Sequence, residues 1–165
     1  MAPYNQLGHF RESLDVSSEY ARLAREDEAA ANTLADVGRY RQAVYFIIQA
    51  MEKHLRAKIF SVVDPTNEDV RQANRNHSIE EAVLFLIGTV SPDPRLQALI
   101  REQFDNYLFQ GLRFNLLHND LRYPTYFERT ATYSCLELSG ADLLVMFGRL
   151  DWLKEFMNEL SLLVM

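Results

Sequence analysis

The sequence predicts an all-α fold, a compact bundle of about five helices, and three observations support this prediction. Glycine and proline are scarce, at 6 and 5 in 165 residues, and they fall between periodic stretches rather than inside them. Apolar residues recur at helical spacing through several long segments. No internal repeat or linker divides the chain, so we expect a single domain over residues 1–165, in which segment 1–16 carries only a weak signal for a further short helix.

The first long helix is expected over about residues 18–37, where apolar residues recur at helical spacing and charged residues occupy the other faces. Ser17 or Ser18 is placed to cap its start, because a serine hydroxyl accepts from the first free backbone N–H groups. Gly38 is placed to end it, since glycine adopts the left-handed conformation at little cost.

The second helix is expected over about residues 39–63 and ends before Pro65. Its apolar stripe consists of Tyr40, Val44, Ile47, Met51, Leu55, Ile59 and Val62. The polar residues expected to cover much of its remaining surface are Arg41, Gln42, Gln49, Glu52, Lys53, Arg56 and Lys58. His54, which lies among them, is expected to face solvent. A polar loop, residues 66–77, follows and has room for one turn of helix.

Three further helices complete the predicted bundle. Ser78 and Glu81 have the spacing of a capping box, which opens a helix over the apolar run 83–90. A fourth helix begins near Pro94 and continues towards Arg122, and the Tyr-Pro pair at 123–124 ends it. The last segment, about residues 130–163, is expected to form one long helix or a broken pair.

Composition and charge exclude several classes of protein. The chain is 48% hydrophobic and 24% charged, as in ordinary soluble domains, and its formal charge is −6. A chain this acidic is not expected to bind duplex DNA through a broad basic surface. No signal peptide is visible, and charged residues interrupt the apolar C-terminal segment, so we expect no membrane association and a cytoplasmic location. Cys135, the only cysteine, excludes an internal disulfide and is expected to be a small buried residue within a helix.

Metal and nucleotide-hydrolase motifs are absent from the sequence. The four histidines are scattered, with no His-Glu-x-x-His and no Cys-x-x-Cys, so no metal site and no cofactor are expected. No glycine-rich phosphate loop is present either. The polar run Arg113-Phe-Asn-Leu-Leu-His118-Asn-Asp-Leu-Arg122-Tyr-Pro, which interrupts an otherwise apolar helix, is therefore the main candidate site.

Several motifs in fixed order resemble those of one family. Arg113 and His118 have four residues between them, which is an R-x4-H pattern, and Arg-Tyr-Pro follows at residues 122–124. The segment 40–53 looks like a signature second helix, and Asn-His-Ser-Ile at 76–79 looks like the opening of a third. Together these features resemble the HEPN family (higher eukaryotes and prokaryotes nucleotide-binding), in its branch with Arg-Tyr-Pro, over roughly residues 18–149.

This resemblance implies a metal-independent endoribonuclease. RNA carries its own nucleophile, the 2′-hydroxyl, so the protein has to supply proton transfer and charge stabilisation. His118 would be the acid/base and Arg113 the group that holds the scissile phosphate. Their Cα atoms lie about 140° apart on an ideal helix, and the resemblance implies a symmetric homodimer whose subunits pool their motifs. The candidate substrate-binding or supporting residues are Asn115, Asn119, Asp120, Arg122 and Tyr123.

Three interpretations stay open. The first is a ribonuclease that acts as a toxin or in defence, which an antitoxin partner would silence. The second is a non-catalytic HEPN module that binds a nucleotide, RNA or a protein partner; it is favoured by Phe114, which stands where active members often have a polar residue, and by the lack of a net basic groove. The third is a structural helical dimer. The apolar tail 161–165 would be buried by a dimer or would close the monomer's own bundle.

Overall fold

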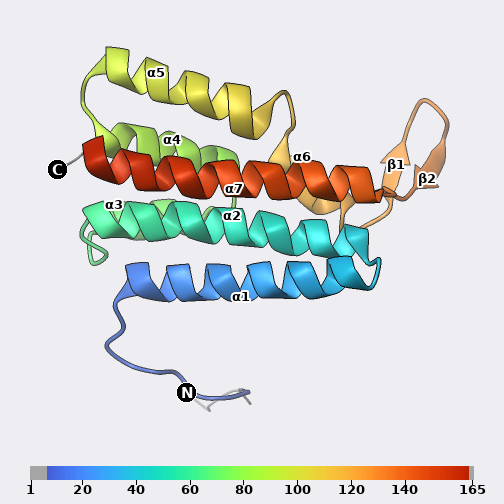
Figure 1. The fold of residues 1–165 in the computed structure, drawn as a ribbon, viewed down its shortest axis with the longest axis horizontal. Helices are drawn as coiled ribbons and strands as arrows, with labels where there is room; N and C mark the ends of the chain where they lie inside the picture. The colour runs from blue at the N-terminus through green and yellow to red at the C-terminus, as the bar shows by residue number, and fades with distance from the viewer. Residues whose placement is uncertain (1–6, 164–165) are drawn as a thin grey trace.

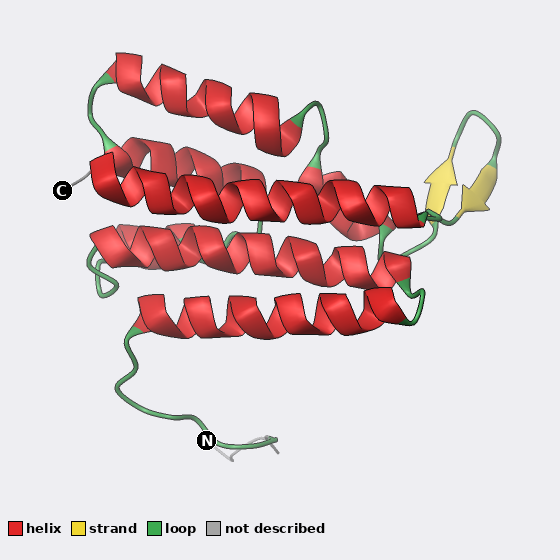
Figure 2. Ribbon diagram, viewed as in Figure 1, coloured by secondary structure: helices red, strands yellow, loops and turns green. Residues whose placement is uncertain are grey.

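A computed structural model describes residues 7–163 of the chain, which are mostly helical (Figure 1). The elements in chain order are α1 (Val16–Asp36), α2 (Tyr40–Val62), α3 (Glu68–Ala73), α4 (Ile79–Val90), α5 (Pro94–Phe104), the π-helix η1 (Asp105–Phe109), α6 (Phe114–Asp120), β1 (Thr125–Phe127), β2 (Thr132–Ser134) and α7 (Gly140–Leu163). The predicted helical architecture is confirmed, with the addition of a two-stranded hairpin at one end of the bundle (Figure 2).

Helix α2 is the centre of the bundle, because it packs against α1, α4 and α7. The apolar stripe predicted for it is largely buried, and Ile47, Met51 and Leu55 are enclosed completely or almost so. Helix α7 contributes Leu150 and Leu153 to the same core. The apolar face of α2 is therefore closely packed on several sides, which restricts where the side chains of this helix can lie.

The helix ends follow ordinary capping chemistry, with one difference from the sequence prediction. The cap of α1 is Asp15, whose side chain accepts from the Ser18 backbone N–H, so the prediction of a serine cap was wrong. Gly38, with φ of 72°, ends the helix as predicted. The Ser78 hydroxyl accepts from the Glu81 backbone N–H at 3.3 Å, which confirms the predicted start of α4.

The predicted fourth helix is not continuous. After α5 the backbone widens into η1, and then Gln110 and Gly111 take left-handed φ values of 45° and 77°. A right-handed helix cannot pass through such residues, so α6 starts afresh at Phe114. Arg113 is consequently the extended residue before α6, and it is not on a common helix with His118.

The predicted last helix begins ten residues later than the sequence indicated. Strand β1 pairs with β2 in antiparallel register, Tyr126 opposite Tyr133, and α7 follows at Gly140. Cys135 lies just after β2 and is exposed, so its prediction as a buried helical residue was wrong. The prediction that His54 faces solvent was also wrong: its Nε2 atom lies 2.5 Å from Glu28 Oε1 between α1 and α2.

Two parts of the sequence analysis concern the chain ends. Residues 7–15 contain no helix, and residues 1–6 lie outside the described residues. The apolar tail 161–165 is described only as far as the end of α7, at 163, so both of its suggested roles remain predictions. None of the helices formed by residues 7–163 combines the length and apolarity required to cross a bilayer.

Candidate functional site

One polar stripe on α2 forms the base of the candidate site. Tyr45, Gln49, Glu52 and Arg56 follow one another at intervals of four, three and four residues, which places them on one face of the helix. Glu52 and Arg56 are buried, although the sequence analysis placed both on the polar outer surface of this helix. The first three residues of this stripe line a pocket of about 610 Å³, and Arg56 lies outside it. The other sides of the pocket are the segment 76–78, Glu81 of α4, helix α6 and Arg122.

His118 projects from α6 onto this stripe. Its imidazole stacks on the Tyr45 ring, with centroids 5.4 Å apart and planes 14° from parallel. Its Nε2 atom lies 3.0 Å from the amide nitrogen of Gln49. With that amide donating, Nε2 carries the lone pair and the neutral ring holds its proton on Nδ1. Sequence reasoning named His118 but missed both residues that orient it.

The electrostatic surroundings keep the imidazole of His118 uncharged. Burial lowers its pKa below the usual 6.5, and the nearby positive charge of Arg122 lowers it further. The charge of Glu52 opposes this shift and that of His77 adds to it. At neutral pH the ring is therefore a proton acceptor, which is the state that a general base requires.

Arg122 is the arginine that lines the pocket with His118. Its Nε atom donates to the His118 carbonyl at 3.3 Å and one terminal nitrogen donates to Asn119 Oδ1 at 3.0 Å. Its guanidinium also lies over the ring of Tyr123, 5.0 Å from the centroid. The remaining donors of this exposed side chain face solvent, so an anion in the pocket can reach them.

Arg113 lies elsewhere. It is exposed and lines a separate hollow of about 470 Å³ between α4, η1 and α6, which His118 does not line. Asn115 borders both hollows, and its backbone N–H donates to Glu80 Oε1 at 3.1 Å, which ties the start of α6 to α4. Within a single chain the structure thus separates the two residues of the R-x4-H pattern.

The other predicted site residues divide into two groups. Asn119 lines the His118 pocket, whereas Asp120 and Tyr123 do not. Asp120 instead accepts a hydrogen bond from Thr125 at 2.6 Å, which fixes the start of the hairpin. Phe114 is buried in the core and packs edge-on against Phe109, so it anchors α6 and does not face the pocket.

A second histidine lines the same pocket and was not among the predicted site residues. His77 Nδ1 lies 3.1 Å from Glu52 Oε1 on the α2 stripe. The spacing of the polar residues along α2, at 45, 49, 52 and 56, is the sequence signal that would have pointed to this site. No group of three or more His, Cys, Asp and Glu side chains within residues 7–163 is arranged to hold a metal ion.

Comparisons of the chain with protein-family models, curated proteins and solved structures found no match.

Proposed function

We propose that this protein is a metal-independent endoribonuclease, of the type that the resemblance to the HEPN family implies. The observation that carries the proposal is the pocket in which neutral His118 and the guanidinium of Arg122 lie side by side. In the reaction the 2′-hydroxyl oxygen attacks the adjacent phosphorus and the bond to the 5′ oxygen breaks. The products are a 2′,3′-cyclic phosphate and a 5′-hydroxyl.

His118 accepts the proton of the 2′-hydroxyl at Nε2. The contact with Gln49 supports this role, because it shows that a hydrogen-bond donor fits at the lone pair of that nitrogen. The stacking on Tyr45 supports it too, since a ring held in one orientation loses little entropy when the substrate binds.

Arg122 binds the scissile phosphate in this proposal and stabilises the additional negative charge of the transition state. Arg113 contributes across a symmetric homodimer, in which the pocket of each subunit receives the arginine of the other. Its exposure and the absence of a hydrogen-bonded partner for its guanidinium among residues 7–163 are compatible with that position. An antitoxin partner that covers the pocket would keep such an enzyme inactive.

The test is cleavage of an end-labelled RNA pool in excess chelator by the wild type and three variants. We expect His118→Ala to lower the rate by about 10²- to 10⁴-fold and Arg122→Gln by a similar factor. Arg113→Ala lowers it as well if the dimer shares its motifs, and light scattering reports the oligomeric state. The matched controls are His9→Ala and Arg129→Gln, which change an exposed histidine and an exposed arginine outside the pocket. Wild-type rates in both His118→Ala and Arg122→Gln would contradict the proposal.

A second candidate function is a non-catalytic module that binds a nucleotide, RNA or a protein partner. The separation of Arg113 from His118 within one chain favours it, as does the burial of Phe114. This function predicts no cleavage of any RNA, together with shifts of the His118 and His77 imidazole resonances when a mononucleotide is added. Cleavage that depends on His118 would exclude it.

A further inference from the structure

Glu52 and Arg56 form a buried ion pair on α2, one turn apart. Their side chains are 10% and 4% exposed, and Oε1 of Glu52 lies 2.9 Å from the guanidinium. Burying two charges costs desolvation energy that their mutual attraction only partly offsets. A pair of this kind is weak evidence for stabilisation, so its other contacts indicate what it does.

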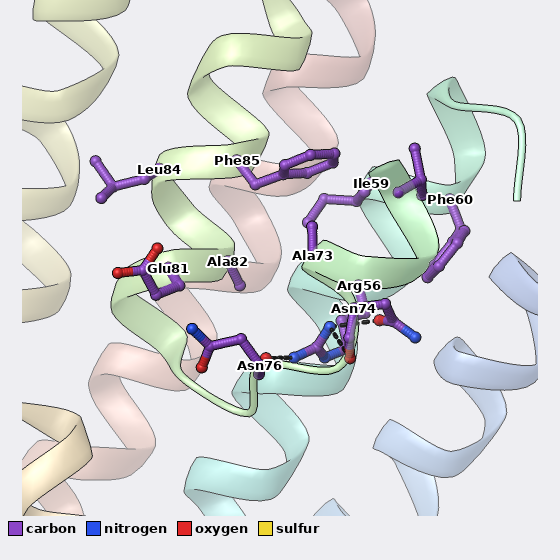
Figure 3. Close-up of a pocket in the computed structure, with 11 residues that line it drawn as sticks. Arg56, Ile59, Phe60, Ala73, Asn74, Asn76, Glu81, Ala82, Leu84 and Phe85 are labelled. Carbon is purple, nitrogen blue, oxygen red and sulfur yellow. Dashed lines mark hydrogen bonds between the residues drawn. The ribbon is translucent and has the colours of Figure 1, made fainter. Parts of the chain in front are cut away.

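Arg56 fixes the segment that leads to His77. Its guanidinium donates to the backbone carbonyls of Asn74 and Asn76 and to the side-chain oxygen of Asn74, as Figure 3 shows. The backbone directly before His77 is therefore attached to α2. Ser78, directly after it, is the cap of α4. Both neighbours of His77 are thus held in place.

Glu52 orients the imidazole of His77. The same Oε1 atom that binds Arg56 lies 3.1 Å from Nδ1 of His77. A carboxylate at Nδ1 selects the tautomer with its proton on that nitrogen and leaves Nε2 for another partner. The side chain of His77 is 77% exposed, so Nε2 is open to a ligand in the pocket.

His77 and His118 line the same pocket from different elements of the fold. Both line the large pocket, and both also line the narrow hollow beneath it, next to Glu52 and Asn115. One histidine comes from the loop before α4 and the other from α6, so a group bound in the pocket can contact both imidazoles.

We propose that His77, positioned by the buried Glu52–Arg56 pair, is the second proton-transfer residue of the site and protonates the leaving 5′ oxygen. This inference rests on the proposed ribonuclease activity. His118 removes the proton of the 2′-hydroxyl, the new bond forms between the 2′ oxygen and phosphorus, and the bond from phosphorus to the 5′ oxygen breaks. The ring of His77 enters this step as the imidazolium, with a proton on each nitrogen, and gives the proton of Nε2 to that oxygen. It is left as the neutral ring with its proton on Nδ1, facing Glu52. No external oxidant, reductant or metal enters the balance.

The experiment compares two versions of one RNA that the wild type cleaves. In the second version, sulfur replaces the 5′ oxygen at the cleaved bond, and a thiolate leaves without needing a proton. We expect His77→Ala to lower cleavage of the oxygen substrate by about 10²- to 10⁴-fold and of the sulfur substrate by less than tenfold. His118→Ala is expected to lower both, because the nucleophile is the same.

The control variant is His9→Ala, and circular dichroism shows whether each variant keeps its helices. Equal losses on the two substrates in His77→Ala, or no loss on either, would overturn the role of His77 while the ribonuclease stands. A wild type that cleaves no RNA overturns the ribonuclease and the role of His77 with it.

The positioning by Glu52 has a separate readout that needs no activity. Two-bond ¹H–¹⁵N spectra of the wild type distinguish the two tautomers of a neutral histidine. We expect the neutral form of His77 to keep its proton on Nδ1, where Glu52 accepts it. A neutral ring protonated on Nε2 would overturn the positioning role.

Discussion

The imidazole of His118 lies against the ring of Tyr45, almost parallel to it and with centroids 5.4 Å apart. This contact joins the seven-residue helix α6 to the central helix of the bundle. The protonation of His118 therefore depends on what surrounds the ring in the fold, which can be tested by titration.

We expect His118 to titrate below the usual histidine value, since burial and then the charge of Arg122 lower its pKa. Replacing Arg122 with Gln removes a positive charge that opposes protonation, so the pKa of His118 should rise. NMR of the imidazole Cε1–H resonances measures both values. Arg129→Gln on the hairpin turn is the matched control and should leave the titration unchanged. A lower pKa of His118 in Arg122→Gln would contradict the electrostatic assignment.

Phe114 anchors α6 and so supports the site indirectly. It is 1% exposed and packs against Phe109, with ring centroids 5.9 Å apart. Phe114→Ala should reduce the free energy of unfolding by about 3–5 kcal/mol, measured by urea denaturation. Leu116→Ala, on the exposed side of the same helix, should cost less than about 1 kcal/mol. Similar losses in the two variants would show that α6 is not anchored in this way.

Two glycines give a test of the break before α6. Gly111 has φ of 77° and Gly88 lies inside α4, and an added Cβ would meet no atom within 4 Å at either position. Gly111→Ala should destabilise the protein by about 1–2 kcal/mol, because alanine is strained in the left-handed region. Gly88→Ala should stabilise it by about 0.5–1 kcal/mol, since alanine favours a helix. Thermal denaturation of the two variants should therefore shift in opposite directions, and a common direction would contradict the assigned backbone.

Glu28 ties three helices together and predicts a pH dependence of stability. One carboxylate oxygen lies 2.5 Å from His54 Nε2 and the other 2.7 Å from Lys154 Nζ. Burial by itself raises the pKa of Glu28, but the hydrogen bonds and charges of Lys154 and His54 outweigh it, and the net pKa is lowered. The ionised group therefore stabilises the fold at neutral pH, and this contribution is lost as the pH falls through the lowered value.

Glu28→Gln should accordingly cost about 1–2 kcal/mol near pH 7, and the difference from the wild type should shrink between about pH 5 and pH 3. Urea denaturation at several pH values measures it. Glu26→Gln is the matched control, because Glu26 pairs with Arg22 on the exposed face of α1 and its replacement should cost less than about 0.5 kcal/mol. A difference for Glu28→Gln that grows on acidification would contradict the assigned shift.

The sequence predicted those elements whose signals are local. The stripe of α2 repeats over six turns, and Ser78 with Glu81 forms a self-contained start signal for α4. The hairpin was missed because each strand has three residues, too few for an alternating pattern to stand out. The break at Gln110 was missed because glutamine rarely takes a positive φ and apolar residues continue at helical spacing on both sides.

The site was predictable in part, for a related reason. His118 and Arg122 belong to one polar run, whereas His77 is joined to them only by the fold. The burial of Glu52 and Arg56 depends on helices α3 and α4 packing beside α2, and no property of α2 alone indicates it.

The interruption between η1 and α6 also affects which part of the protein unfolds locally first. Turns bound α5 and η1 at both ends, and their buried side chains are Ile100, Phe104 and Leu108. With few fully buried anchors, the α5–η1 segment can separate from α4 and α7 while α2 and α7 remain packed together. In deuterium-exchange mass spectrometry, amides of residues 94–109 should exchange well before those of α2, and the rate should increase when Arg149→Met removes the bond from α7 to the Phe109 carbonyl. The α5–η1 segment then unfolds locally, independently of the rest of the bundle, and it borders the hollow that Arg113 lines.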